Sequence, residues 1–284
     1  MTTLSTGWIG IAKEHETLLD DARLDKSYVL FRKDLAEAFR QAAEALEAAR
    51  PKEPFLEKGN RPETPLTDMP IDATVLNLLF REILHNLAKY GGQTNSMKKL
   101  ADAVTDEINL LVQLVKLSIF NWDGQELKTL AGKIDIPYAD ALFTGRILAV
   151  PFLQETVLMT RPRKLDTTGE EYKNCPNCGC PPAFATLKEE SGQRQLVCTL
   201  CNTDWTFPRI KCPFCGNTDQ AKLNVIFADE DKNRRLEVCE ECKRYIKTID
   251  ERSAGTAVNP FTEETHTLIL DLLAEKNGYV NRLY

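Results

Sequence analysis

Apolar residues recur at helical spacing through the first 160 residues. The pattern predicts helices over residues 27–50, 72–90, 96–120, 123–134 and 139–159. In the second of these, Leu79, Ile83 and Leu87 fall on one stripe, and two glycines follow where the helix should end. Residues 50–70 contain five prolines, so we expect a loop there. Several amphipathic helices joined by loops are typical of a helical bundle, which we place at residues 1–165.

Two histidines, His15 and His85, fall within the predicted bundle. His85 lies opposite the apolar stripe of its helix, so we expect it on a solvated face. His15 lies among charged residues, and no pattern around it points to a role. Since no serine–histidine–aspartate set or carboxylate pair stands out, the sequence predicts no catalytic and no cofactor-binding residue.

The helical pattern stops near residue 160 and returns only at the end of the chain. Residues 160–174 have the composition of a linker. A last helix is predicted to open at residues 259–262, with Thr262 as its N-cap and two glutamates in its first turn. Ile269, Leu272 and Leu273 give this helix an apolar side, and an Asn-Gly pair should end it.

All nine cysteines lie between Cys175 and Cys242. Eight of them form four C-x2-C pairs: Cys175/Cys178, Cys198/Cys201, Cys212/Cys215 and Cys239/Cys242. Nineteen residues separate the first pair from the second and 23 separate the third from the fourth, and both gaps suit a β-hairpin. Two residues between ligands let a tight turn present both sulfurs to one ion. Gly179 and Gly216 follow the second cysteine of their pairs, where a positive φ would complete such a turn.

The two halves of the cysteine region look like copies of each other. Their first pairs are offset by 37 residues and their second pairs by 41, which indicates a four-residue insertion near residues 229–233. We expect two rubredoxin-like or zinc-ribbon modules at residues 170–210 and 211–284, the second including the last helix. Each would hold one mononuclear metal ion through four cysteines, and the spacing suits iron and zinc equally. Modules this small need the metal for stability.

Some alternatives stay open at the level of sequence. Cys212 and Cys215 have the spacing of a thioredoxin-type redox pair, although no βαβ pattern surrounds them. The pairs Cys198/Cys201 and Cys212/Cys215 are near enough to form one site between them. Cys180 is left over, and is either a small residue beside the first turn or a spare reactive thiol.

Composition and charge exclude several classes of protein. The chain has 284 residues, 43% of them apolar and 27% charged, which suits about two soluble domains. Its net charge of −6 divides into −4 for residues 1–170 and −2 for the rest, so neither half has the basic surface of a general nucleic-acid binder. The best apolar run, Leu110–Phe120, is short and interrupted, so we expect no membrane span. Without a basic and apolar leader we expect a cytoplasmic protein, where paired cysteines are metal ligands more often than disulfides.

Five stretches carry a resemblance to a known family. They are Cys175-Pro-Asn-Cys-Gly-Cys-Pro-Pro182, Val197-Cys-Thr-Leu-Cys-Asn-Thr-Asp-Trp205, Arg209-Ile-Lys-Cys-Pro-Phe-Cys-Gly216, Val238-Cys-Glu-Glu-Cys-Lys-Arg-Tyr-Ile-Lys247 and Asp271-Leu-Leu-Ala-Glu-Lys-Asn-Gly-Tyr279. This region resembles the formate dehydrogenase accessory proteins of the FdhE type. It departs from the family pattern at Cys180, where the family more often has a residue without a thiol.

The resemblance implies a chaperone-like accessory protein and not an enzyme. Its partner would be the catalytic subunit of a formate dehydrogenase during maturation, and the family's metal would be iron. The four cysteine pairs would be the ligands. The oligomeric state stays open.

Two other functions are weighed against this one. A rubredoxin-like electron carrier would use iron in the same sites. A zinc-ribbon nucleic-acid binder rests on a basic cluster that neighbouring acids largely cancel. The cluster consists of Lys232, Arg234, Arg235, Lys243, Arg244 and Lys247.

Overall fold

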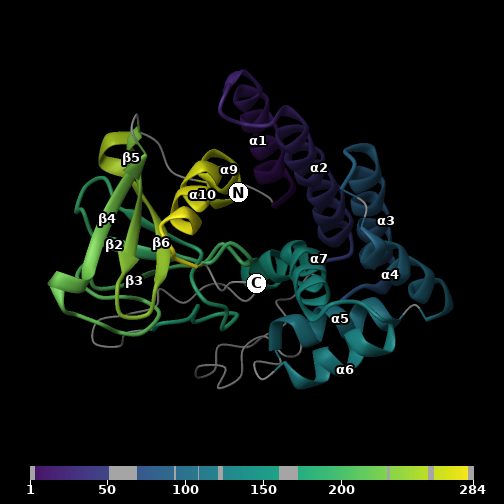
Figure 1. Cartoon of the computed structure of the whole chain (residues 1–284). Helices are drawn as coiled ribbons and strands as arrows, with labels where there is room; N and C mark the ends of the chain where they lie inside the picture. The colour runs from purple at the N-terminus through teal and green to yellow at the C-terminus, as the bar shows by residue number, and fades with distance from the viewer. Residues whose placement is uncertain are drawn as a thin grey trace. The chain divides into compact units, whose positions relative to one another are not determined.

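The chain forms two compact units, Met1–Pro162 and Arg163–Tyr284, in a computed structural model (Figure 1). The structure describes residues 4–50, 69–92, 94–107, 109–120, 124–159, 172–228, 231–254 and 259–280. Most of the predicted loop at 50–70 and of the predicted linker at 160–174 lies outside these ranges. Each unit is described by itself.

The first unit is helical. Its helices are α1 (Leu4–Thr17), the short 3-10 helix η1 (Leu18–Asp20), α2 (Lys26–Ala48), α3 (Ala73–Lys89), α4 (Asn95–Asp106), α5 (Asn109–Phe120), α6 (Gln125–Lys133) and α7 (Tyr138–Met159). Side chains that accept backbone N–H bonds start three of them: Asp25 caps α2, Asp72 caps α3 and Thr94 caps α4. The predicted helical character of the N-terminal region is confirmed.

Helix α1 is absent from the sequence prediction. Trp8, Ile11 and His15 are buried along one side of it, and the Trp8 ring meets Phe39 of α2 edge to face at 4.9 Å. The spacing of Trp8, Ile11 and Leu18 was the available signal, and the charged residues between them concealed it. The buried Nδ1 of His15 lies 2.8 Å from the carbonyl oxygen of Ile11, whereas His85 is exposed, as predicted.

The helix predicted over residues 96–120 is two helices, α4 and α5. Glu107 has an extended backbone, with φ −140° and ψ 92°, and it ends α4. Just before it, the hydroxyl of Thr105 donates to the carbonyl of Ala101, the kind of local bond that weakens a helix end. The break accompanies complete burial of Leu100 on α4 and Leu111 on α5.

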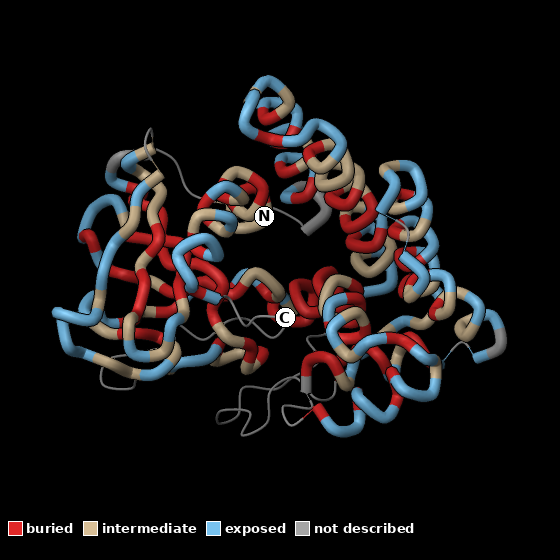
Figure 2. Tube along the Cα trace, viewed as in Figure 1, coloured by how far each residue is buried: buried red, intermediate tan, exposed pale blue. Residues whose placement is uncertain are grey.

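Helix α7 is largely buried (Figure 2). It is long and apolar enough to cross a membrane by length and composition, which the search for apolar runs in the sequence overlooked. In its most apolar window 72% of the residues are buried within the structure, and packing against neighbouring helices accounts for that apolar character. Gly145 allows α5 to approach closely, since a Cβ there would lie 1.9 Å from the Ser118 hydroxyl.

The second unit is built on one six-stranded sheet. Its strands are β1 (Phe184–Leu187), β2 (Arg194–Val197), β3 (Asp204–Thr206), β4 (Leu223–Ala228), β5 (Asp231–Cys239) and β6 (Arg244–Asp250), in the order β3-β2-β1-β6-β5-β4. Each half is a three-stranded antiparallel meander with a C-x2-C pair before its first strand and another after its second. The repeat seen in the sequence is therefore a repeat of structure.

The halves share this sheet instead of each closing a separate one. Strands β1 and β6 pair in parallel, Phe184 opposite Lys247 and Leu187 opposite Asp250. The first and third strands of an antiparallel meander run in the same direction. The two meanders have the same orientation, and the first strand of one lies beside the third strand of the other, so these two strands are parallel. The junction also pairs two strand edges that separate modules would expose. Residues 231–233 of the predicted insertion belong to β5, so they lengthen a hairpin arm.

Helical segments flank the strands of this sheet. The 3-10 helix η2 (Gln220–Lys222) precedes β4, and α8 (Glu251–Ala254), α9 (Pro260–His266) and α10 (Leu268–Lys276) follow β6. Asn259, not the predicted Thr262, caps α9, because its side chain already accepts the N–H of Phe261. Lys247, buried in β6, binds Asp271 at 2.8 Å and so ties α10 to the sheet.

Candidate metal centres

The four C-x2-C turns have the same backbone geometry. In each, the residue after the second cysteine has a positive φ and donates its N–H to the carbonyl of the first cysteine. These residues are Gly179, Asn202, Gly216 and Lys243, with N–O distances of 2.8, 2.9, 3.0 and 2.9 Å. The positive φ predicted for the two glycines is confirmed. Asparagine and lysine adopt it in the other two turns, where no positive φ was predicted.

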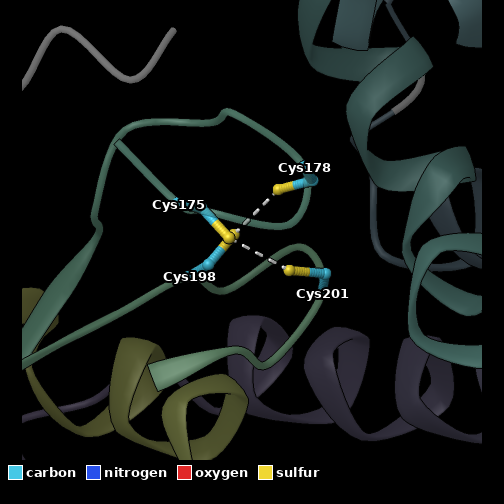
Figure 3. Close-up of side chains that lie close together, drawn as sticks. All are labelled: Cys175, Cys178, Cys198 and Cys201. Carbon is cyan, nitrogen blue, oxygen red and sulfur yellow. Dashed lines mark hydrogen bonds between the residues drawn. The ribbon is translucent and has the colours of Figure 1, made fainter. Parts of the chain in front are cut away.

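The first cluster gathers four buried sulfurs (Figure 3). The Sγ atoms of Cys175 and Cys201 lie 3.5 Å apart, and those of Cys178 and Cys198 lie 3.4 Å apart. None of the four residues is more than 3% exposed. The first and second pairs are thus brought together by the β1–β2 hairpin between them.

The second cluster has the same arrangement and is more open. Cys212 and Cys242 have sulfurs 3.7 Å apart, as do Cys215 and Cys239. Cys212 and Cys239 are buried, Cys242 is half-buried and Cys215 is exposed. One side of this cluster therefore faces solvent.

The sulfur spacing fits a four-coordinate metal. A disulfide has an S–S bond of about 2.05 Å, and every Sγ–Sγ distance here is at least 3.4 Å. Metal–sulfur bonds of about 2.3 Å in a tetrahedron give edges of about 3.8 Å. Within each cluster all four sulfurs lie within 4.8 Å of one another. Each cluster could hold one ion, and the alternative that joined the second pair to the third is wrong.

Electrostatics in the clusters favour a bound cation. Hydrogen bonding with Cys175, together with burial, raises the pKa of the Cys178 and Cys198 thiols. Burial also raises the pKa of Cys212 and Cys242. Four thiols held this closely do not ionise together unless a positive charge compensates them, and a divalent metal supplies that charge.

Backbone N–H groups assist the ionised form of some of these thiols. Burial alone would raise the pKa of Cys239, but N–H groups of Cys242 and Glu241 outweigh it and the pKa is lowered. The N–H groups of Cys215 and Phe214 act on Cys212 in the same direction. Each turn therefore partly neutralises its own thiolates.

Cys180 occupies a position that recurs in three of the turns, five residues after the first cysteine. The N–H of the first cysteine donates to the carbonyl of this residue, which is Cys180, Thr203 or Asn217. The Thr203 hydroxyl lies 3.1 Å from the Cys201 sulfur, and the Asn217 amide donates to the Cys239 sulfur at 3.8 Å. Cys180 is 2% exposed, and it contributes to the raised pKa of the Cys178 thiol. The ninth cysteine is thus a buried residue beside the first cluster.

The aromatic residues beside the turns are mostly part of the core. Trp205, Phe207 and Tyr245 are at most 6% exposed, while Phe214 is half-buried under the guanidinium of Arg244. Much of the basic cluster suspected of binding nucleic acid is ion-paired. Arg234 binds Glu263 at 2.6 Å, and Lys243 binds Glu240. These ion pairs agree with the prediction that neighbouring acids largely cancel the charge of the basic cluster.

Comparison with known proteins places these clusters in a family. The sequence profile of the FdhE central domain matches residues 174–209, and that of the FdhE C-terminal domain matches residues 210–283. Residues 174–283 therefore carry the central and C-terminal domains of the FdhE family. The boundary between these FdhE domains lies at the end of the first meander, so each domain contributes one cysteine cluster.

FdhE relatives agree with this over part of their length. The FdhE homologue of Aquifex aeolicus is 34% identical over 140 residues, which cover 48% of this chain and 49% of that protein. That of Glaesserella parasuis is 27% identical over 199 residues, 66% of this chain and 64% of the relative. The chain therefore spans about half to two thirds of these relatives. The crystal structure of the FdhE protein from Pseudomonas aeruginosa superposes with a TM-score of 0.60 at 20% identity, covering 96% of this chain and 94% of that one, which shows a shared fold.

Proposed function

We propose that this chain is a cytoplasmic accessory protein that binds the catalytic subunit of a formate dehydrogenase and assists its maturation. The observation that carries the proposal is the pair of four-cysteine clusters in a chain that carries the central and C-terminal domains of the FdhE family. Four thiolates complete a tetrahedral coordination sphere, so such an ion has no open position for a substrate. We therefore infer a role in binding, with no catalytic step of its own.

In this proposal the metal ions stabilise the fold of the two meanders that form the binding surface. The eight ligands are Cys175, Cys178, Cys198, Cys201, Cys212, Cys215, Cys239 and Cys242. Strands β1 and β2 have only four residues each, too few to support a folded meander by apolar burial alone. The bound ion would supply the missing stability, and iron and zinc both suit four thiolates.

The test is co-purification of the chain with a tagged formate dehydrogenase catalytic subunit. We expect a complex with the wild-type chain and none with C175S/C178S, which would lose the buried cluster. C180S is the matched control, because it removes a cysteine beside that cluster and leaves the four ligands in place. Failure of the wild-type chain to bind either the immature or the mature subunit would contradict the proposal.

Electron transfer is a second candidate function, favoured by one observation. Cys215 is exposed and Cys242 half-buried, so an iron ion in the second cluster would lie near the surface, as exchange of electrons with a partner requires. Iron-loaded protein should then be red and titrate reversibly in a redox cell. Full support of maturation by a colourless zinc form would exclude this function and leave the first intact.

A further inference from the structure

The second unit contains a cavity of about 610 Å³ on the face of the sheet opposite α9 and α10. Val225, Glu237 and Ile246 are direct partners across β4, β5 and β6, so their side chains lie on one face and line the cavity. Leu236, on the other face, packs with residues of α10. Residues 209–214 contribute to the lining, as do Cys212 and Cys239 of the second cluster. The volume is in the range of small-molecule sites.

Positive charge dominates the lining. Its cationic residues are Arg194, Arg209, Lys211, Arg235 and Arg244, and Glu237 is the one acidic residue in the described part of the lining. The Glu237 carboxylate is shared, at 2.9 Å, between Arg194 and Arg235. Arg235 also approaches Asp250 at 3.9 Å, but that carboxylate is already paired with Arg252. The lining therefore carries a clear excess of cations.

Arg194 is buried deeply for a charged residue. It is 2% exposed, and its guanidinium donates to the carbonyls of Pro208 and Lys211 at 3.1 and 2.9 Å. The Nε atoms of Arg194 and Arg235 are both buried without a hydrogen-bond partner among the described residues. Buried guanidinium groups are costly unless anions compensate them, and here one carboxylate, that of Glu237, serves two of them.

The metal centre beside the cavity does not account for the whole excess. Four thiolates around a divalent ion carry a charge of −2, and Glu237 adds −1. The five cations of the lining outnumber these three negative charges. Apolar side chains form much of the remaining wall, among them Leu223, Val225 and Ile246. A ligand that matched both features would carry an anionic group on an apolar or planar body.

We propose that this cavity binds a small organic phosphate ester. Its phosphate group would accept hydrogen bonds from the guanidinium groups, which suit the bidentate geometry of phosphate. Its organic body would lie against the apolar wall and the ring of Phe214, over which Arg244 stacks at 3.7 Å. The cavity is much larger than a bare phosphate ion needs, so an ester is favoured over the inorganic anion. This proposal does not depend on the formate dehydrogenase partner.

The test is binding of phenyl phosphate to the metal-loaded full chain. Calorimetry and the 31P resonance of the ligand measure this binding. We expect saturable binding that falls about tenfold or more in R209Q and in R235Q, because each loses a charge-assisted hydrogen bond. Binding should become tighter in E237Q, which removes the competing carboxylate and keeps its shape. K276Q, which removes an exposed cation of α10 outside the lining, is the control and should bind like wild type.

Metal content is measured on each variant, so that a loss of folding is not read as a loss of binding. Absence of saturable binding at millimolar phenyl phosphate would overturn the proposal, and so would wild-type affinity in both R209Q and R235Q. Equal affinity for benzoate, which lacks the second charge, would overturn the choice of phosphate. Tighter binding of a short acidic peptide would instead assign the cavity to a protein segment, which also contradicts the proposal.

Discussion

The two clusters should release metal at very different rates. In the first, all four cysteines are at most 3% exposed, so a chelator must wait for the turn at residues 175–180 to open. Opening breaks the bonds Cys175 N–H to Cys180 O, Gly179 N–H to Cys175 O, and the Asn177 amide to the Thr203 hydroxyl. At about 1 kcal/mol net for each bond, the cost is about 3 kcal/mol. That corresponds to release about 100-fold slower than from the second cluster, where Cys215 is already exposed.

A coloured chelator added to zinc-loaded protein provides the assay. We expect two phases of equal amplitude, one per ion. The fast phase should disappear in C215S, and N177A should speed the slow phase about fivefold, since it removes one of the three bonds. N95A, an exposed asparagine of the helical unit, is the matched control and should change neither phase. Release in a single phase, or a fast phase that survives in C215S, would refute the reasoning.

Three further predictions concern other parts of the chain. C180T, which places at this position the hydroxyl that Thr203 supplies in the second turn, should retain both ions after dialysis, whereas C180A should lose the slow ion sooner; equal retention would contradict a role for this position in holding the ion. G145A should lower the melting temperature by about 4–8 °C, from a loss of about 2 kcal/mol, because the new methyl group meets Ser118. The control G132A, with nothing within 4 Å, should raise it slightly, and circular dichroism measures both. Burial raises the pKa of Asp34, but hydrogen bonds from α3 outweigh it and the pKa lies below its usual range. We therefore expect D34N to have a lower free energy of unfolding than wild type at pH 7, and the difference should vanish as the pH falls below about 4. Urea unfolding of both proteins at pH 7 and below about pH 4 measures this difference.

The cysteine clusters could be predicted closely from the sequence. Ligand pairing follows from local geometry, since two residues between cysteines set each turn and the hairpin length sets which turns meet. The same local rule predicted the positive φ of Gly179 and Gly216. It missed Lys243, because lysine seldom adopts that conformation and only the tertiary structure imposes it.

Long-range features could not be predicted in this way. The parallel pairing of β1 with β6 joins residues more than 60 positions apart, and no local pattern specifies it. The cationic cavity has the same origin: Arg194 and Glu237 belong to different halves of the repeat, so their contact depends on how the halves meet. Basic and acidic residues are mixed along the sequence, so the sequence shows no local excess of positive charge. The fold creates that excess by bringing the cations of the cavity together.

Some helices of the first unit were predicted wrongly from the sequence for related reasons. Helix α1 is held by burial of Trp8 against α2, a tertiary contact, and the charged residues in its sequence hid its apolar side. Helix α4 ends at Glu107, whose extended backbone interrupts the apolar stripe predicted over residues 96–120. Helical periodicity over a long window is insensitive to such a break.

Cobalt titration of the metal-free chain tests the central claim most directly. Tetrahedral cobalt bound by four thiolates has intense visible and near-ultraviolet bands, which count occupied sites. We predict saturation at two ions per chain with four thiolates each, and at one such ion in C215S. Saturation of the wild-type chain at fewer than two tetrathiolate ions would contradict the account of two metal centres.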